Sequence, residues 1–114
     1  MTPAILDITI NKGITFGLVL KLKDAALSPV SLVGYSVFAD ARLKPTSTAI
    51  AFSLSPTISD APQGEVTISL TDEATALLKH GIFHWDLVIE NPSGERLGPF
   101  VEGAVFVKAL ATQP

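Results

Sequence analysis

The residues best suited to chemistry lie together in one stretch, TDEATALLKHGIFHWDL, at positions 71–87. It holds His80 and His84, the single tryptophan Trp85, and three acids. Two imidazoles with carboxylates nearby could bind a metal ion, or one imidazole could act as a general base. A structural metal site, however, needs about four converging ligands, which two histidines on either side of a loop do not supply. We therefore interpret the stretch as the junction between a short helix and a core strand.

The junction begins with a predicted helix over about 71–80. Thr71 can accept a hydrogen bond from a first-turn amide, and the two acids that follow it lie at the positive end of the helix dipole. Lys79 and His80 lie near the negative end, and Gly81 suits the left-handed position after a helix. So short a helix needs packing to persist in water. Its predicted apolar stripe consists of Ala74, Leu77 and Leu78.

Asp86 of this stretch could also meet Asp40 and Glu102 as paired carboxylates on neighbouring strands. The chain has 11 acids spread along its length, so such pairs arise by chance, and we interpret these three as part of a solvated strand face. Strand alternation places His84 on the same outer face as Asp86. The sequence has no nucleophile elbow, HExxH, P-loop, GxGxxG or EF-hand motif. We therefore predict a protein that is not an enzyme, with no catalytic residue, cofactor or metal.

Short apolar segments alternate with turn signals about every dozen residues along the chain, which favours a β-sandwich or barrel. Within most segments, alternate apolar residues predict one buried face, whereas in the segment 35–43 either face could be the buried one. In the segment 82–90 this buried face contains Phe83, Trp85, Leu87 and Ile89. The segments 24–34 and 56–64 are predicted to be loops. The predicted strands are 5–10, 16–23, 35–43, 49–55, 65–70, 82–90 and 97–109.

Composition narrows the class of protein. The 114 residues fit one domain, 1–114. The net charge is −3, and Lys21 and Lys23 form the closest approach to a basic cluster, which disfavours nucleic-acid binding. No cysteine is present, which excludes disulfides and thiolate chemistry, and neither a signal peptide nor a membrane-spanning run is expected. Only 17 % of residues are charged, against about 25 % in ordinary domains, so we expect partners to cover part of the surface.

The order of the motifs resembles a known family. GEVTISLTDEATALLKHGIFHWDLVIENPSGERL joins a strand, a short helix, a glycine and an aromatic strand, after ITINKGITFGLVLKLKD and VSLVGYSVFADAR and before EGAVFVK. This resembles the small immunoglobulin-like β-sandwich domains of tailed-bacteriophage structural proteins, such as the N-terminal domain of baseplate upper proteins and short virion proteins. The resemblance spans roughly residues 6–108, and its most specific pieces are Gly64–Thr71 and Gly81–Leu87. It implies an immunoglobulin-like antiparallel sandwich of about seven strands with one short helix.

The resemblance also implies a virion protein, assembled in the host cytoplasm and packed as a homo-oligomer among tail, baseplate, fibre or capsid subunits. Related domains that bind receptors continue beyond the last strand, whereas this chain ends at Pro114, which favours an adaptor that anchors a fibre or hub. A capsid cement or decoration protein is the alternative within this class. A carbohydrate-binding module is the alternative outside it, and would need aromatic residues on an open face, whereas Trp85 is predicted to be buried.

We expect partner contacts at the chain ends, at two loops and at aromatic residues of the last strand. Phe100 and Phe106 share one side of that strand, and an exposed aromatic side would call for a partner. No nucleic-acid or membrane contact is expected. The candidate contact residues are Met1, Pro3, Ile5, Leu27, Pro29, Ile58, Pro62, Phe100, Phe106 and Leu110.

Overall fold

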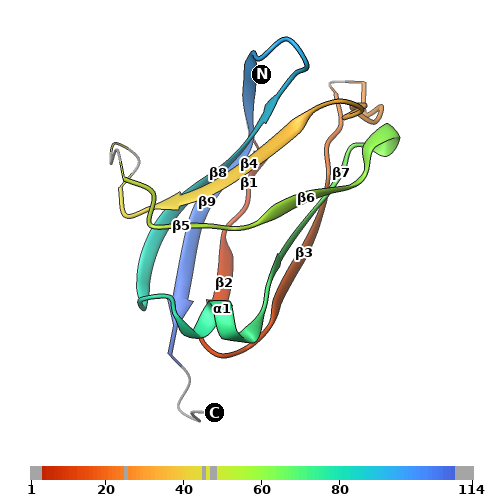
Figure 1. Ribbon diagram of the computed structural model, residues 1–114. Helices are drawn as coiled ribbons and strands as arrows, with labels where there is room; N and C mark the ends of the chain where they lie inside the picture. The colour runs from red at the N-terminus through yellow and green to blue at the C-terminus, as the bar shows by residue number, and fades with distance from the viewer. Residues whose placement is uncertain (1–3, 25, 45, 47–48, 110–114) are drawn as a thin grey trace.

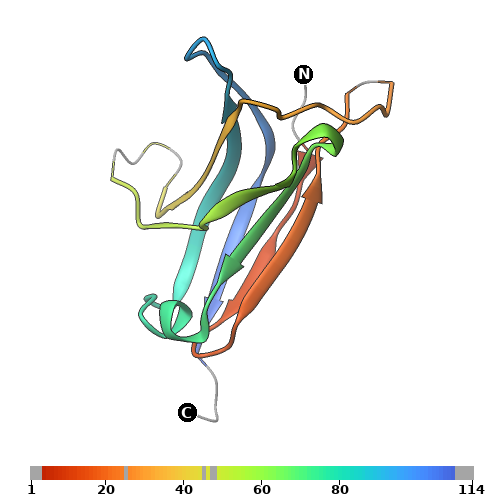
Figure 2. The ribbon, with the colours of Figure 1, turned by 45° about the vertical axis from the view of Figure 1, so that its right-hand side comes forward.

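The computed structural model describes residues 4–24, 26–44, 46 and 49–109, which form two packed β-sheets (Figures 1 and 2). One sheet contains β1 (Ala4–Ile5), β2 (Ile8–Asn11), β4 (Ser36–Arg42), β5 (Phe52–Ser53), β8 (Gly81–Glu90) and β9 (Arg96–Lys108). The other contains β3 (Phe16–Lys21), β6 (Pro56–Asp60) and β7 (Glu65–Leu70). A 3-10 turn, η1 (Ala61–Gln63), precedes β7, and the helix α1 (Asp72–Ala76) follows it. The predicted all-β sandwich is thus confirmed.

The strand order is that of an immunoglobulin-type sandwich. The larger sheet runs β1-β9-β8-β4-β5, with β2 also pairing β9, and the smaller runs β3-β7-β6. Both β1 and β2 pair with β9 in parallel, so the larger sheet is mixed rather than wholly antiparallel. No helix among the described residues is long and apolar enough to cross a membrane.

The core lies between the sheets, where the alternating apolar residues meet. As predicted, Phe83, Trp85, Leu87 and Ile89 are all buried. So are Val66, Ile68 and Leu70 of β7 and Val105 and Val107 of β9. Each fully buried aliphatic side chain stabilises the fold by roughly 1.5–3 kcal/mol relative to exposure, so the period-2 pattern decides which face of each strand turns inward.

The segment 49–64 differs from its prediction. The expected strand 49–55 is ordered as a strand only over Phe52–Ser53, Ile50 is exposed, and the expected loop 56–64 begins with strand β6. The reason is a change of sheet at Ser55, whose φ of 51° turns the chain. Before this turn the amide of Leu54 donates to the Ala39 carbonyl of β4, and after it β6 pairs with β7.

The helix α1 is shorter than predicted and buries a different residue. Thr71 caps it as expected, its Oγ1 accepting from the Ala74 amide at 3.1 Å. The helix ends at Ala76, Leu77 is 85 % exposed, and Gly81 begins β8 instead of capping the helix. Thr75 is fully buried, because its hydroxyl joins α1 to the turn between β2 and β3. A polar anchor therefore replaces part of the expected apolar stripe.

Candidate functional site

The candidate site is a groove on the outer face of the six-stranded sheet, with a volume of about 310 Å³. We call it the acidic groove. It crosses the sheet from β4 over β8 to β9 and β1, so four strands from distant parts of the sequence build it. Its lining residues are Ile5, Asp40, Arg42, His84, Trp85, Asp86, Glu102 and Gly103.

Three carboxylates form a row across this groove. Asp40 on β4 lies directly opposite Asp86 on β8, which lies directly opposite Glu102 on β9. Residues in direct register have Cβ atoms about 4.5–5.5 Å apart, and like charges at that spacing repel each other. Sequence reasoning identified these three acids and interpreted them as a chance grouping on a solvated face, whereas the structure brings them into one row.

The row depends on an irregularity in β9. Between the pairs Leu87↔Val101 and Ile89↔Leu97, β8 advances by two residues and β9 by four. Gly98 lies within this β9 bulge at φ 119°, a conformation that side-chain-bearing residues rarely adopt. Had the hairpin kept the register it has at Glu90↔Arg96, Asp86 would face Phe100 rather than Glu102.

The electrostatics of the groove centre on Asp86. Partial burial on the groove floor raises the pKa of this carboxyl, the neighbouring Arg42 lowers it, and Asp40 and Glu102 raise it, with a net rise. Arg42 stands opposite His84 in the next row along the same two strands. Such a face can hold a cationic group or exchange protons. No set of three or more His, Cys, Asp or Glu side chains in the described ranges has the geometry to hold a metal ion.

The two histidines lie in different parts of the surface. His84 is exposed and lines the acidic groove, as its outer-face position predicted, whereas His80 is exposed in the turn between α1 and β8 and is absent from the groove lining. The junction interpretation of residues 71–87 therefore agrees with the structure. What it missed is that the outer face carrying His84 is a grooved surface.

The groove floor rests on a close backbone approach. Trp85 is 3 % exposed, and its indole N–H donates to the Leu6 carbonyl oxygen at 2.9 Å. That oxygen lies where a side chain on Gly103 would have to be, so only glycine fits there. The adjacent Asp7 carboxylate accepts from the Ala104 amide at 2.9 Å. These contacts hold the segment between β1 and β2 across β9, and they show Trp85 as a core residue rather than an exposed platform.

The predicted partner contacts fall into three groups. Ile5 and Leu27 are 70 % and 76 % exposed, and Pro29 and Pro62 are also exposed. Ile58 and Phe100 are half-buried and pack against the core, so they offer less surface than expected. Phe106 is half-buried in register with the exposed Ile82 on β8. Met1, Pro3 and Leu110 lie outside the described residues.

Sequence reasoning missed several exposed apolar residues. Val33 lies in the connection from β3 to β4, and Leu43 follows β4 directly. Leu77 follows α1 at the opposite end of the sandwich from the β3–β4 connection (Figure 2). The only sequence signal for the first two is that each is an apolar residue within a turn-rich stretch.

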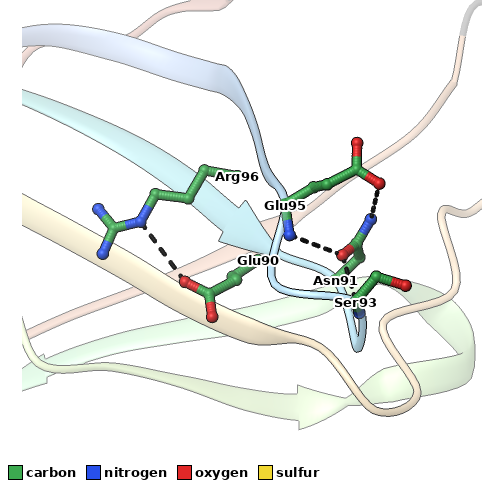
Figure 3. A network of polar contacts seen from close by, with 5 residues as sticks. All are labelled: Glu90, Asn91, Ser93, Glu95 and Arg96. Carbon is green, nitrogen blue, oxygen red and sulfur yellow. Dashed lines mark hydrogen bonds and ion pairs between the residues drawn. The ribbon is translucent and has the colours of Figure 1, made fainter.

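The β8–β9 hairpin has its own polar network (Figure 3). The Asn91 side-chain oxygen accepts from the amides of Ser93 and Glu95 at 3.0 and 2.9 Å. At the base of the hairpin, Arg96 pairs with Glu90 at 3.5 Å and covers the Phe38 ring at 4.5 Å from its centroid. These contacts give the polar side chains of the hairpin partners within the hairpin and on β4.

The comparisons with known proteins do not assign the chain to a family. No family model matches the chain, and no curated protein matches it. Among solved structures it is similar to Listeria monocytogenes InlP, at 14 % identity and a TM-score of 0.46, covering 90 % of this chain and 26 % of that one. A family 123 glycoside hydrolase from Clostridium perfringens matches at 8 % identity and a TM-score of 0.41, covering 94 % and 23 %. The chain thus spans about a quarter of each, and neither likeness carries an argument about function.

Proposed function

We propose that this chain is a non-enzymatic bacteriophage virion structural protein, an adaptor in the tail or baseplate that binds neighbouring subunits by surface complementarity. The virion context comes from the resemblance carried by Gly64–Thr71 and Gly81–Leu87. The binding role draws on the surface of the molecule. The two supports are independent, and they can fail separately.

The observation that carries the binding role is the set of large apolar side chains exposed on turns and loops. Leu27, Val33, Leu43 and Leu77 are each at least 60 % exposed. Single exposed apolar residues are ordinary, but here they recur on three connections of one small sandwich: between β3 and β4, after β4 and after α1. An interface that used them would bury them against a neighbour and gain the hydrophobic free energy that the isolated chain forgoes.

Sheet edges add a second means of association. β5 pairs β4 at Asp40 and Ala41, so the half of β4 from Ser36 to Phe38 pairs with no described strand on that side. Unpaired edges accept added strands through backbone hydrogen bonds. Repetition of weak contacts around a symmetric assembly would supply avidity.

The alternative within the same class is a capsid cement protein. The experiment is to purify intact particles, detect this chain by mass spectrometry and count its copies per particle. Small multiples of three or six support a tail or baseplate position, whereas hundreds of copies support the head. Absence from particles contradicts both assignments.

A carbohydrate-binding module is separated by a glycan array. This alternative needs aromatic rings on an open face, and the tryptophan, which would be the strongest platform, is buried under the Leu6 carbonyl. Binding of a defined glycan, lost on mutation of Phe38 or Phe106, would replace the adaptor proposal.

A further inference from the structure

A tight turn from Asp24 to Ser28 projects from the sandwich beyond the end of β3 (Figure 2). We call it the Leu27 turn. The Asp24 carboxylate accepts from the amides of Ala26 and Ser28 at 2.9 and 3.0 Å. The Asp24 backbone also bonds to Leu27 and Ser28 at 2.9 Å each, and Lys23 bridges to Pro29 just outside. These bonds tie the backbone of residues 26–28 to Asp24.

Leu27 contradicts two local rules at once. Its φ is 64°, in the left-handed region that residues with a Cβ rarely adopt, and its side chain is 76 % exposed. Glycine or asparagine would suit this backbone better, and a polar side chain would suit water better. Local choices that oppose folding are expected at functional positions. A leucine held rigidly in water is well suited to enter a neighbour's surface, because little conformational entropy is lost on binding.

The charges beside Leu27 indicate which surface that is. Lys21 and Lys23 are exposed on the strand that leads into the turn. A complementary surface would carry an excess of carboxylates next to an apolar wall, and the acidic groove has three carboxylates against the one cation Arg42, with Ile5 at its edge. Glu102 lies in the carboxylate row, and its neighbour in register is Ile5, which is 70 % exposed.

We propose that the Leu27 turn of one copy docks in the acidic groove of a second copy, with Lys23 facing the carboxylate row and Leu27 packing on Ile5. The turn and the groove are different surfaces of one copy, so a single contact joins copies head-to-tail, and two reciprocal contacts join them about a two-fold axis. Head-to-tail contacts close into rings or extend into filaments. This inference rests on the proposed function, since it names one of the neighbouring subunits.

The experiment is sedimentation velocity of the purified chain over a wide concentration range at low salt, up to millimolar protein. The natural chain is expected to show reversible, concentration-dependent association that weakens as salt screens the ion pairs. Leu27→Gly is expected to weaken the apparent affinity by about tenfold or more. Its Tm is expected to be no lower than that of the natural chain, because glycine accepts the left-handed backbone.

Ser55→Gly is the matched control, because Ser55 is also exposed at a positive φ of 51°. It should leave association unchanged. Lys23→Glu alone and Asp86→Lys alone should each weaken association by about tenfold, and the double variant should recover most of the affinity if the two charges face each other.

The outcomes separate this inference from the proposed function. A chain that stays monomeric at millimolar concentration overturns the inference, as does association that Leu27→Gly leaves intact or that neither single charge reversal weakens. Failure of the double variant to recover affinity overturns the pairing of Lys23 with the groove. Self-association by a chain that is absent from particles leaves the inference standing and removes the virion role alone.

Discussion

The two outer faces of the sandwich differ in the neighbours that they give to their carboxylates. On the three-stranded sheet, the Ser59 hydroxyl donates to Glu65 Oε1 and the Thr67 hydroxyl donates to Ser59 Oγ, both at 2.9 Å. Lys21 lies opposite Glu65 in register, so that carboxylate has a cation and a donor beside it. On the six-stranded sheet, three carboxylates stand next to one another. The first face sets its carboxylate beside a cation and a donor, whereas the second holds three carboxylates beside one cation, Arg42.

The strongest test of this contrast uses one glycine from each sheet. Gly103→Ala should lower the free energy of unfolding by about 3 kcal/mol, because its Cβ would meet the Leu6 carbonyl that Trp85 holds in place. Gly17→Ala on β3 is the control, since no atom lies within 4 Å of the added Cβ. Urea denaturation should show Gly17→Ala as neutral or slightly stabilised. Equal losses in the two variants would show that the close approach under the acidic groove is unimportant.

Neutralising one carboxylate on each face should have opposite effects. Asp86→Asn should raise the free energy of unfolding by about 0.2–1 kcal/mol at neutral pH, because partial burial and two like-charge neighbours disfavour the charge of Asp86 more than Arg42 favours it. Glu65→Gln should lower it by a similar amount, because the carboxylate beside Lys21 and Ser59 is lost. Both changes keep the shape of the residue, and thermal unfolding of the two variants would compare them. A stability loss in Asp86→Asn contradicts the repulsive row.

The gain from Asp86→Asn should depend on pH. Since the pKa of Asp86 is raised in the folded protein above its ordinary value of 3.8, the folded state binds this proton more tightly than the unfolded state does. The natural chain therefore loses stability relative to the variant as pH rises from about 3.8 through the folded-state pKa. Denaturation at a series of pH values should show the two chains converging in acid. A difference in unfolding free energy that stays constant from acid to neutral pH would contradict a raised pKa of Asp86 in the folded protein.

The smallest effect is that of salt. At about 1 M salt the screening length falls to about 3 Å, so repulsion within the exposed row should weaken. The stability advantage of Asp86→Asn should then shrink by a few tenths of a kcal/mol, as measured by urea denaturation at low and high salt. An advantage that grows with salt would show that the attraction of Arg42, which salt also screens, outweighs the two repulsions.

Much of the fold was predictable because it depends on local alternation. The inward positions of β7 and β8 and the cap at Thr71 follow from residue type and spacing alone. The end of α1 was not predictable, because it depends on the bonds of Thr75 to a turn 61 and 62 residues away. The change of sheet at Ser55 was also missed, since a serine carries no strong signal for a positive φ.

Only part of the candidate site could be predicted from the sequence. Its acids could be chosen from the sequence as a possible group on neighbouring strands, but period 2 placed only Asp86 on an outward position. Whether they face one another depends on strand register, and here the β9 bulge near Gly98 decides it. The strain at Leu27 likewise became visible only with the backbone.

By itself, the sequence determined the sandwich class and the inward face of most strands, because burial of alternate apolar residues is a local demand that each strand expresses in its own spacing. Only the tertiary structure decided which outward residues became neighbours, since pairing across strands joins residues far apart in the chain. The carboxylate row is a property of register, and register is set by turns, bulges and close backbone contacts acting together.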